Sequence, residues 1–348
     1  MSELTIQGRG IGDGHPCYVI AEAGSNHNGS HAQALHLIEL AAAAGADAVK
    51  FQVFRAKKLY PRSAGRSDYL GLPTSIYDVI EQMETPYEWL PDLAAQCRES
   101  GIHFLASAFD EESVDILDPY VDAHKVASYE MTHAPLLRHV AAKGKPVILS
   151  TGTANLAEVA ESVRVFRGTG NDRLVLLQCT GAYPAPPESL DLRSIPTMRA
   201  EFGVPVGLSD HSRDPIVAPV AAVALGACVI EKHFTFSNEL PGPDHRFAVE
   251  PHELATLVAK VREVEAALGT GAKDVQAAEE ELRSFARRSI FVTAEVAEGE
   301  AFTSANIAVL RNGKAGSGLA PDRLDEVLRR VAARSLAAET ALSEADLA

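Results

Sequence analysis

Residues 229–235 read VIEKHFT and residues 206–212 read VGLSDHS, two apolar runs that end in residues able to bind metal or phosphate. Side chains alternate between the faces of a strand, so Glu231 and His233 are predicted on one face and the lysine between them on the other. His211 and His233 then lie at the carboxyl ends of two strands that one helix connects. A lone histidine in a strand is usually a core or rim residue, but this pair with neighbouring acids favours a metal site.

The rest of the chain alternates strand-like apolar runs with helical patterns, and a long insertion follows the second run. Eight strand–helix units are predicted, with strands near residues 17–24, 48–53, 103–108, 123–128, 146–151, 174–179, 204–210 and 228–234. Continuous Val, Ile, Leu and Ala indicate strands covered on both faces, as in a (β/α)8 TIM barrel. An open doubly wound sheet is the alternative. It is disfavoured because AEAGSNHNG, not a glycine-rich nucleotide fingerprint, ends the first strand.

The composition excludes several classes of partner. The chain has 348 residues, 46% of them hydrophobic, and a formal net charge of -15, which disfavours binding to nucleic acid or anionic membranes. The first residues lack the hydrophobic region that a signal peptide contains. The most apolar segment further along the chain is interrupted by Pro219 and Gly226. We therefore expect a cytoplasmic protein without a membrane segment. The four cysteines have no metal-binding spacing and are predicted to be buried thiols.

The composition of the sequence changes after residue 268, where the predicted barrel (residues 1–268) ends. Residues 269–286 are charged and predict a partly helical linker. Residues 287–348 predict a small β-rich domain, because 296–307 and 336–347 repeat a strand that leads into a capped helical turn. Between the repeats a glycine-rich loop carries Arg311, which suits presentation of a basic side chain to another surface.

Polar residues collect where barrel enzymes place their chemistry, at the carboxyl ends of the predicted strands. They are Glu22, Asn26, His27, Lys50, Gln52, Ser107, Lys125, Ser128, Glu130, Ser150, Tyr183, Ser209, Asp210, His211, Glu231 and His233. Lys50 and Lys125 lie within apolar strands, and their convergence on one mouth favours a site for phosphate or carboxylate. Two imidazoles with oxygen donors suit Mn²⁺ or a similar ion with open positions. Polarisation of an aldehyde, aldol-type bond formation, epimerisation and phosphoester hydrolysis all remain compatible.

Eight motifs in order narrow these reactions: AEAGSNHNGS, AVKFQ, KVASYE, ILSTG, CTGAYPAP, GLSDHS, IEKHFT and GPDH. Together with the C-terminal repeat, they resemble the sialic acid (N-acetylneuraminate) synthase family, whose barrel is followed by an antifreeze-like SAF domain. The resemblance implies a transferase that condenses phosphoenolpyruvate with N-acetylmannosamine or a related aldose. The products are a nonulosonic acid and phosphate, released by carbon–oxygen cleavage. It also implies Mn²⁺ or Mg²⁺, and a domain-swapped homodimer in which the SAF domain of one protomer covers the barrel mouth of the other.

The resemblance also implies roles for individual residues. His211 and His233 hold the metal, and Glu22 handles protons on the water that adds to C2 of phosphoenolpyruvate. The phosphate and carboxylate of phosphoenolpyruvate are held by Lys50, Lys125, Ser128, Ser150 and Ser209. The sugar is oriented by Gln52, Glu130, Tyr183 and Asp244, and by Arg311 from the other protomer.

The chain departs from the family pattern at two places near the expected acceptor. Gly181 follows the Cys-Thr pair where a larger residue is common, and the family's Arg-Pro-Gly is Arg311-Asn312-Gly313. Because of these departures, the identity of the acceptor sugar stays open. The acceptors that could be accommodated are N-acetylmannosamine, diacetamido hexoses leading to legionaminic or pseudaminic acid, and mannose leading to the deaminated nonulosonate. A metal-dependent hydrolase or epimerase is disfavoured, because the first strand lacks a His-x-His. A non-catalytic binding protein is disfavoured, because the lysine, serine and histidine positions are all filled.

Overall fold

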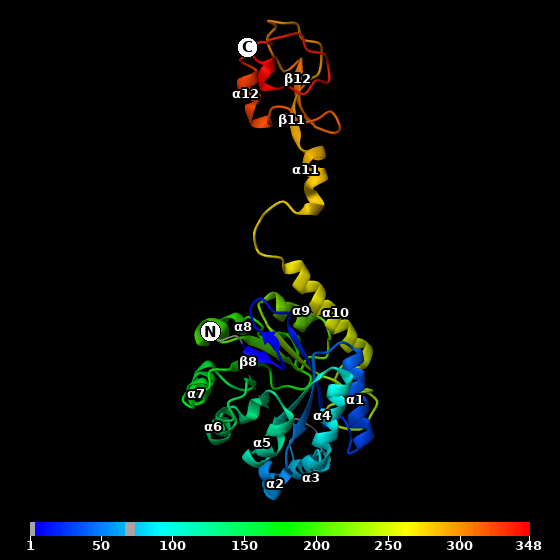
Figure 1. Cartoon of the computed structure of the whole chain (residues 1–348), viewed down its shortest axis with the longest axis vertical. Coiled ribbons are helices and arrows are strands. Elements are labelled where there is room, and N and C mark those ends of the chain that lie inside the picture. The colour runs from blue at the N-terminus through cyan, green and yellow to red at the C-terminus, as the bar shows by residue number, and fades with distance from the viewer. Residues whose placement is uncertain (1–3, 67–73) are drawn as a thin grey trace. The chain divides into compact units, whose positions relative to one another are not determined.

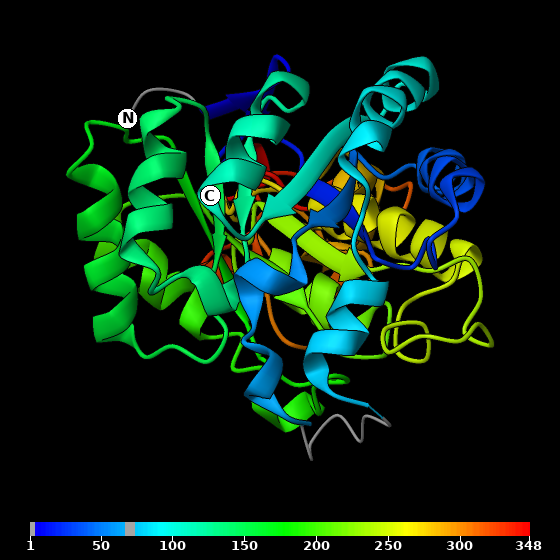
Figure 2. The same cartoon turned by 90° about the horizontal axis from the view of Figure 1, so that it is seen from below.

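The computed structural model describes residues 4–66 and 74–348, which form two compact units that divide between Gly269 and Thr270. The first unit contains a closed barrel of parallel strands in the order β10-β3-β4-β5-β6-β7-β8-β9, with helices around it (Figures 1 and 2). The TIM-barrel prediction is confirmed. The barrel strands are β3 (Tyr18–Gly24), β4 (Ala48–Val53), β5 (His103–Ala108), β6 (His124–Val126), β7 (Val147–Ser150), β8 (Leu174–Cys179), β9 (Val206–Asp210) and β10 (Val229–His233).

Each strand is followed by a helix, and several of these helices begin or end at recognisable capping residues. Ser30 caps α1 and Asn155 forms a capping box with Glu158 on α7, while Gly101 ends α4 with a φ of 69°. These helices are α1 (His31–Ala43), α4 (Leu90–Ser100), α5 (Glu111–Leu117), α6 (Ala134–Ala142), α7 (Leu156–Arg167), α8 (Ser194–Phe202), α9 (Val217–Ala224) and α10 (Pro251–Leu268). Short 3₁₀ turns in this unit outside the insertion are η3 (Asp118–Tyr120), η4 (Ser128–Glu130) and η5 (Pro187–Ser189).

The predicted insertion lies between β4 and α4 and carries short elements of its own. They are α2 (Ala56–Leu59), η1 (Arg62–Ala64), α3 (Ile76–Gln82) and η2 (Tyr87–Trp89). Residues 67–73 of the insertion lie outside the described residues.

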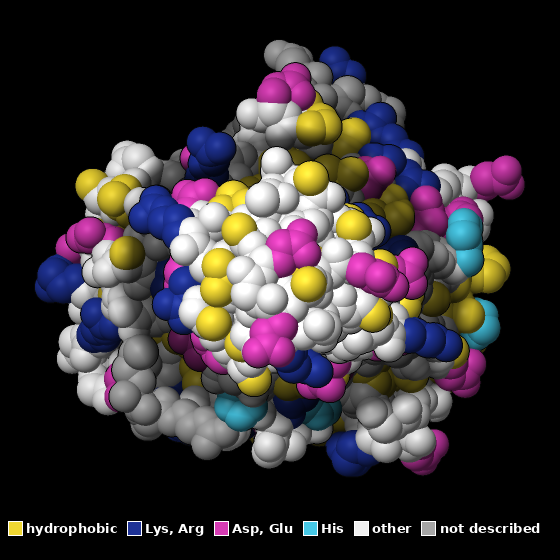
Figure 3. Space-filling view, turned by 90° about the horizontal axis from the view of Figure 1, so that it is seen from above, with side chains coloured by type: hydrophobic (Ala, Val, Ile, Leu, Met, Phe, Trp, Pro, Cys, Tyr) yellow, Lys and Arg dark blue, Asp and Glu magenta, His cyan; other side chains and the backbone are white. Residues whose placement is uncertain are grey.

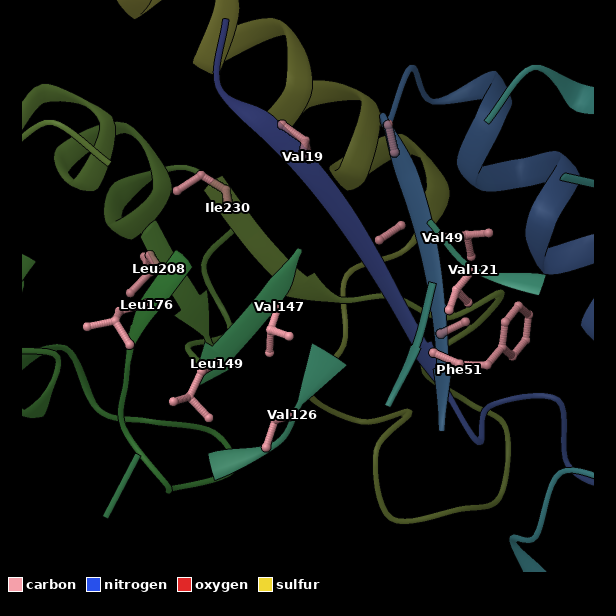
Figure 4. Close-up of a cluster of buried hydrophobic side chains, with 14 of the residues drawn as sticks. Val19, Val49, Phe51, Val121, Val126, Val147, Leu149, Leu176, Leu208 and Ile230 are labelled. Atoms are coloured by element: carbon pink, nitrogen blue, oxygen red, sulfur yellow. The ribbon is translucent and has the colours of Figure 1, made fainter. Parts of the chain in front are cut away.

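Alternation along the strands separates two cores. On β10, Ile230 packs in the layer between strands and helices, whereas Val229 packs inside the barrel. Figure 4 shows members of the outer layer, among them Val19, Leu176 and Ile230, on their strands. Because the inward series on β10 continues from Val229 to two polar residues, the apolar barrel core gives way to a polar mouth at the carboxyl end.

A hairpin that the sequence analysis did not predict precedes the barrel. Strands β1 (Leu4–Ile6) and β2 (Arg9–Ile11) pair antiparallel, and the side chains of Leu4, Ile6 and Ile11 join the core inside the barrel. Tyr18 and Val229, at the starts of their strands, belong to the same cluster. The hairpin therefore covers apolar side chains at the amino end of the barrel.

The C-terminal unit begins with a segment that contains η6 (Ala277–Glu279) and α11 (Glu280–Ala286). Its small sheet pairs β11 (Arg288–Val292) antiparallel with β12 (Ile307–Arg311), and η7 (Pro321–Arg323), α12 (Leu324–Val327) and η8 (Glu344–Asp346) follow. In both predicted repeats a side-chain oxygen accepts a backbone N–H three residues earlier, from Thr303 to Asn306 at 2.7 Å and from Ser343 to Asp346 at 2.8 Å. The second repeat makes a 3₁₀ turn there, η8, and the first makes a single helical turn, in which the backbone N–H of Ile307 donates to the carbonyl oxygen of Thr303 at 3.0 Å.

The surface and the thiols carry two further observations. Among the helices of residues 4–66 and 74–348, none is both long and apolar enough to cross a membrane. Acidic and basic side chains are interspersed on the face that Figure 3 shows. Cys17, Cys97 and Cys179 are buried free thiols as predicted, whereas Cys228 is only partly buried.

Candidate active site

A buried cluster of charges lies inside the carboxyl end of the barrel. The Nζ atom of Lys50, on β4, is 2.6 Å from Glu22 Oε2 and 3.6 Å from Glu231 Oε1. The Nζ atom of Lys125, on β6, is 3.8 Å from the same oxygen of Glu231. All four residues are buried, so two cations balance two anions in a medium where an isolated charge is costly. Glu231, to which the sequence analysis gave no role, bridges the two lysines.

The pKa values of these groups follow from burial and from their neighbours. Burial acts to lower the pKa of Lys50, but Glu22 and Glu231 raise it above its ordinary value. Burial lowers the pKa of Lys125. Burial raises the pKa of Glu22 even though Lys50 lies beside it. Burial also acts on Glu231, but Lys125 and Lys50 hold the pKa of this carboxyl below its usual range. Glu22 is thus the carboxyl of the pair that takes up a proton more readily.

Serine hydroxyls surround the two lysines. Lys125 Nζ donates to Ser150 Oγ at 2.7 Å, and Lys50 Nζ donates to Ser107 Oγ at 3.2 Å. Ser209 Oγ donates to Glu231 Oε1 at 3.2 Å. Because a hydroxyl can both donate and accept, these serines can turn toward an entering anion while the lysines neutralise its charge.

Ser128 lies next to Gly152 at the edge of the same cluster. The backbone N–H of Gly152 donates to Ser128 Oγ at 3.0 Å. A Cβ atom at position 152 would be 2.8 Å from Ser128 Oγ and 3.0 Å from Cys179 Sγ. Glycine is required for this close approach. Gly152, which follows β7, is therefore as much a part of the site as Ser128 is.

The two histidines lie together at the ends of β9 and β10. The ring centroids of His211 and His233 are 5.2 Å apart at an interplanar angle of 73°. Tyr183 stacks on His211 at 4.2 Å, and Phe247 lies 5.0 Å from His233. His211 Nδ1 is 2.8 Å from the carbonyl oxygen of Thr180, which can only accept, so Nδ1 carries a hydrogen and Nε2 is the nitrogen left for a metal. Burial acts to lower the pKa of His211, but Cys179 and the Thr180 carbonyl raise it above its ordinary value, and a metal at Nε2 would displace the proton there.

The two imidazoles fit a divalent ion. His233 Nδ1 is buried without a hydrogen-bond partner, and burial followed by the charge of His211 holds the pKa of His233 well below its ordinary value. A neutral imidazole with an unsatisfied nitrogen is the form that binds a metal. Within the described ranges, no three His, Cys, Asp or Glu side chains meet as a set that could hold an ion. An ion held by two imidazoles keeps positions open for water or substrate.

Three predicted sugar- and proton-handling groups gather around Gly24. Gln52 Nε2 donates to Glu22 Oε1 at 2.8 Å, and His233 Nδ1 is 3.6 Å from Asp244 Oδ2. A Cβ atom on Gly24 would be 3.3 Å from Glu22 Oε1, 3.5 Å from Gln52 Nε2 and 3.7 Å from Asp244 Oδ2. Burial, and next the charge of Glu22, raises the pKa of Asp244 to about 6. Glu22 thus links the lysine cluster to the histidine pair.

Glu130 is a buried carboxyl at the side of the site. Burial raises its pKa to about 7, and the charge of Lys125 only partly opposes the rise. One of its oxygens, Oε2, is buried without a hydrogen-bond partner. This oxygen is available to a ligand, in keeping with the predicted contact to the sugar.

Replacing Glu130 by Gln is expected to change how stability depends on pH. The folded carboxyl has a pKa of about 7 against 4.5 for the unfolded group, so the native state binds the extra proton between these values. Stability should fall as the pH rises from about 4.5 to about 7, by about 3 kcal/mol at 1.36 kcal/mol per pKa unit. The variant should lack this fall. Urea unfolding of both proteins at pH 5 and pH 8 measures it, with Glu239→Gln, an exposed glutamate, as the control. Parallel pH profiles for wild type and Glu130→Gln would contradict the assignment.

Three strand-end residues do not face the mouth. Asp210 lies on the outer face of β9 and pairs with Lys232 at 2.7 Å, so it is not an acid beside His211 as predicted. Asn26 donates to the backbone oxygen of Phe234 at 2.8 Å, and His27 contacts Thr85. These side chains fasten loops to the rim.

Comparison with known proteins decides the family. The sequence profile of the NeuB family matches residues 37–273. The chain belongs to the NeuB family. The profile of the SAF domain matches residues 287–348, so the predicted resemblance is confirmed.

Relatives place the chain among synthases of nonulosonic acids. It is 43% identical to the spore coat polysaccharide biosynthesis protein SpsE of Bacillus subtilis, over 98% of this chain and 96% of that protein. It is 38% identical to the N,N'-diacetyllegionaminic acid synthase of Legionella pneumophila, over 95% and 94% of the two chains. The crystal structure of the N-acetylneuraminic acid synthetase of Leptospira borgpetersenii matches with a TM-score of 0.74 at 33% identity, over 81% of this chain and 95% of that one. This NeuB-family protein is therefore an enzyme of carbohydrate biosynthesis.

The two departures from the family pattern have local structural causes. A Cβ atom on Gly181 would be 2.7 Å from Thr153 Cγ2 and 3.5 Å from the hydroxyl of Tyr129, so these side chains fill the space of a larger residue. In the SAF domain, Asn312 donates its backbone N–H to Arg287 at 2.8 Å and its side-chain amide to Ser284 at 3.3 Å. A proline at 312 could not make the backbone bond.

Arg311 is the one predicted site residue in the other compact unit. It ends β12 opposite Arg288, and it is exposed on the SAF domain. The sequence analysis placed Glu231 at the mouth beside His233 but gave it no role, and it missed two other contributors, Gly152 and Phe247. Phe247 lies in a loop without periodicity and gave no signal.

Proposed function

We propose that this protein condenses phosphoenolpyruvate with an aldose, N-acetylmannosamine or one of its relatives, and releases a nonulosonic acid and phosphate. The observation that carries the proposal is the adjacency of two elements at one barrel mouth. One is the Lys50–Lys125 cluster with its hydroxyls, and the other is the His211–His233 pair. The first suits an anionic donor and the second suits a polarised aldehyde.

The residues of the mouth divide the work between donor and acceptor. The phosphate and carboxylate of phosphoenolpyruvate are held by Lys50, Lys125, Ser128, Ser150 and Ser209. The aldose is oriented by Gln52, Glu130, Tyr183 and Asp244. His211 and His233 would hold Mn²⁺ or Mg²⁺, which supplies Lewis-acid polarisation of the aldehyde when bound.

The proposed bond changes balance with water as the only reactant besides phosphoenolpyruvate and the aldose. C3 of phosphoenolpyruvate forms a bond to the aldehyde carbon, whose oxygen takes up a proton and becomes a hydroxyl. Water adds to C2 and loses a proton, and the bond between C2 and the bridging oxygen breaks as phosphate leaves with the second proton of that water. Glu22, whose pKa burial raises, takes the proton from the water. Lys50 stays within 2.6 Å of this carboxylate and stabilises the charge on it.

The test is phosphate release from phosphoenolpyruvate with Mn²⁺ against a panel of aldoses. The panel contains N-acetylmannosamine, mannose, mannose 6-phosphate and diacetamido hexoses, and the product is identified by its mass. With ¹⁸O in the bridging position of phosphoenolpyruvate, carbon–oxygen cleavage places the label in the phosphate. Phosphate release that does not depend on any sugar would instead support a hydrolase. Binding of metal and phosphoenolpyruvate without release would point to an acceptor outside the panel.

The dimer is part of the proposal, with Arg311 of one protomer acting at the barrel mouth of the other. Support comes from α11, where Leu282 and Phe285 are 61% and 45% exposed in the single chain. Two large apolar side chains exposed on one short helix suit burial against a second copy.

Mixing two inactive variants tests whether Arg311 acts on the partner. Lys125→Met and Arg311→Ala should each be inactive alone. After subunit exchange, a mixed dimer contains one barrel with an intact Lys125 that receives an intact Arg311. Random pairing then restores about a quarter of wild-type activity per chain, because half of the dimers have one complete site. Light scattering checks the dimer itself. No recovery in a mixture shown to have exchanged would contradict the role across protomers.

A further inference from the structure

A pocket lies at the opposite, amino end of the barrel, remote from the residues of the mouth. It has a volume of about 520 Å³ and is formed by the loop after the hairpin, the turn between α7 and β8, α8, and the starts of β9 and β10. Its polar lining comprises Asp13, His15, Arg167, Asp172, Arg173 and Arg199. Barrel enzymes place catalysis at the other end, so no step of the proposed reaction uses this pocket.

The pocket concentrates positive charge on an acidic protein. Three arginines line it against two aspartates, whereas the chain as a whole has a net charge of -15. The charge of one of the aspartates is already neutralised, because Asp13 forms an ion pair with Arg199. Arg167 donates to the backbone oxygen of Phe202 at 2.7 Å, and no carboxylate among the described residues forms an ion pair with it.

Arg173 is the arginine of the pocket whose guanidinium is most available to a ligand. In residues 4–66 and 74–348 its guanidinium has neither a hydrogen-bond acceptor nor an ion-pair partner, and it is exposed. A guanidinium offers a rigid fork of donors that matches the oxygens of a phosphate or carboxylate. Two such groups without carboxylate partners in one cavity favour an anion.

The floor of the pocket is apolar. Leu4, Ile11, Leu174, Val204 and Val206 line it and are buried. Pockets that bind small molecules combine an apolar lining with a few polar groups that fix orientation, in volumes of about 300–1,000 Å³. The cavity therefore has room for an organic body attached to the anionic group.

We propose that this pocket is a binding site for a small metabolite that carries a phosphate or carboxylate group. The arginines hold the anionic group, and the apolar lining contacts the organic body attached to it.

Protection of arginines from chemical modification tests the site directly. Phenylglyoxal modifies accessible guanidinium groups, and peptide mass spectrometry gives the rate at each arginine. Inorganic phosphate is the probe, with chloride at matched ionic strength for comparison. Arg167 and Arg173 should be protected in a saturable manner, about tenfold at a phosphate concentration ten times its Kd. Arg193, which is exposed and does not line the pocket, should react at the same rate throughout.

Variants separate a formed site from general screening by salt. In the full-length Arg173→Ala protein, the phosphate protection of Arg167 should be lost, whereas Arg193→Ala should retain it. Equal modification of Arg167 with phosphate and with chloride would overturn the proposal, as would protection that persists in Arg173→Ala. The readout is confined to these arginines, so its outcome is independent of whether the proposed synthase reaction is correct.

Discussion

Replacing Lys232 by Met is expected to lower the free energy of unfolding by about 3–5 kcal/mol, because it strands a buried charge. The ammonium group is 2.7 Å from Asp210 Oδ2, and these side chains are 1% and 0% exposed. It also donates to the backbone oxygens of Ser212 and of Asp214, the latter at 2.9 Å. One lysine thus stabilises the whole loop that carries His211.

Two further variants make this stability prediction specific. Lys260→Met removes an exposed lysine whose ion pair is with Glu263, and it should change the unfolding free energy by less than about 0.5 kcal/mol. Asp210→Asn combined with Lys232→Met removes the stranded charge and should recover part of the loss. Urea unfolding measures all three. A Lys232→Met protein as stable as Lys260→Met would show that Asp210 is neutral or solvated in the native state.

Periodicity was enough to predict the barrel, and the reason is visible in its strands. Each of β3, β4, β5 and β8 is a run of six or seven residues with at most one that is not buried, long enough to be recognised in the sequence. The hairpin strands β1 and β2 have three residues each, too few for a pattern to develop. Their contribution depends on packing against the inside of the barrel, which no local pattern specifies.

Strand alternation would also have placed Asp210 correctly. Because Ser209 and His211 face the mouth, the residue between them must face outward, where it lies opposite Lys232 in the register of β9 and β10. The bridge from Glu231 to Lys50 and Lys125 is different. It joins strands that are not neighbours in the barrel, so it depends on closure and strand order and could not be predicted from spacing.

Replacing His233 by Ala is expected to abolish turnover while the fold remains intact. The imidazole lies 5.2 Å from His211 between ring centroids, and its buried Nδ1 has no hydrogen-bond partner. If it is one of two protein ligands of the metal, its loss removes several kcal/mol of polarisation, a decrease in kcat/KM of at least about 10³-fold. Steady-state phosphate release with Mn²⁺ measures the loss of turnover, and circular dichroism of the variant checks that the fold is intact.

A second measurement separates loss of the metal from loss of packing. Titration of Mn²⁺ by electron paramagnetic resonance should show weaker binding in His233→Ala, whereas His252→Ala, which removes a 77% exposed histidine, should bind as wild type does. Near-normal turnover of His233→Ala with added Mn²⁺ would refute the metal role. Normal Mn²⁺ binding with lost turnover would instead assign His233 to the substrate. The first protein group to reconsider would then be Asp244, whose Oδ2 lies 3.6 Å from the same imidazole.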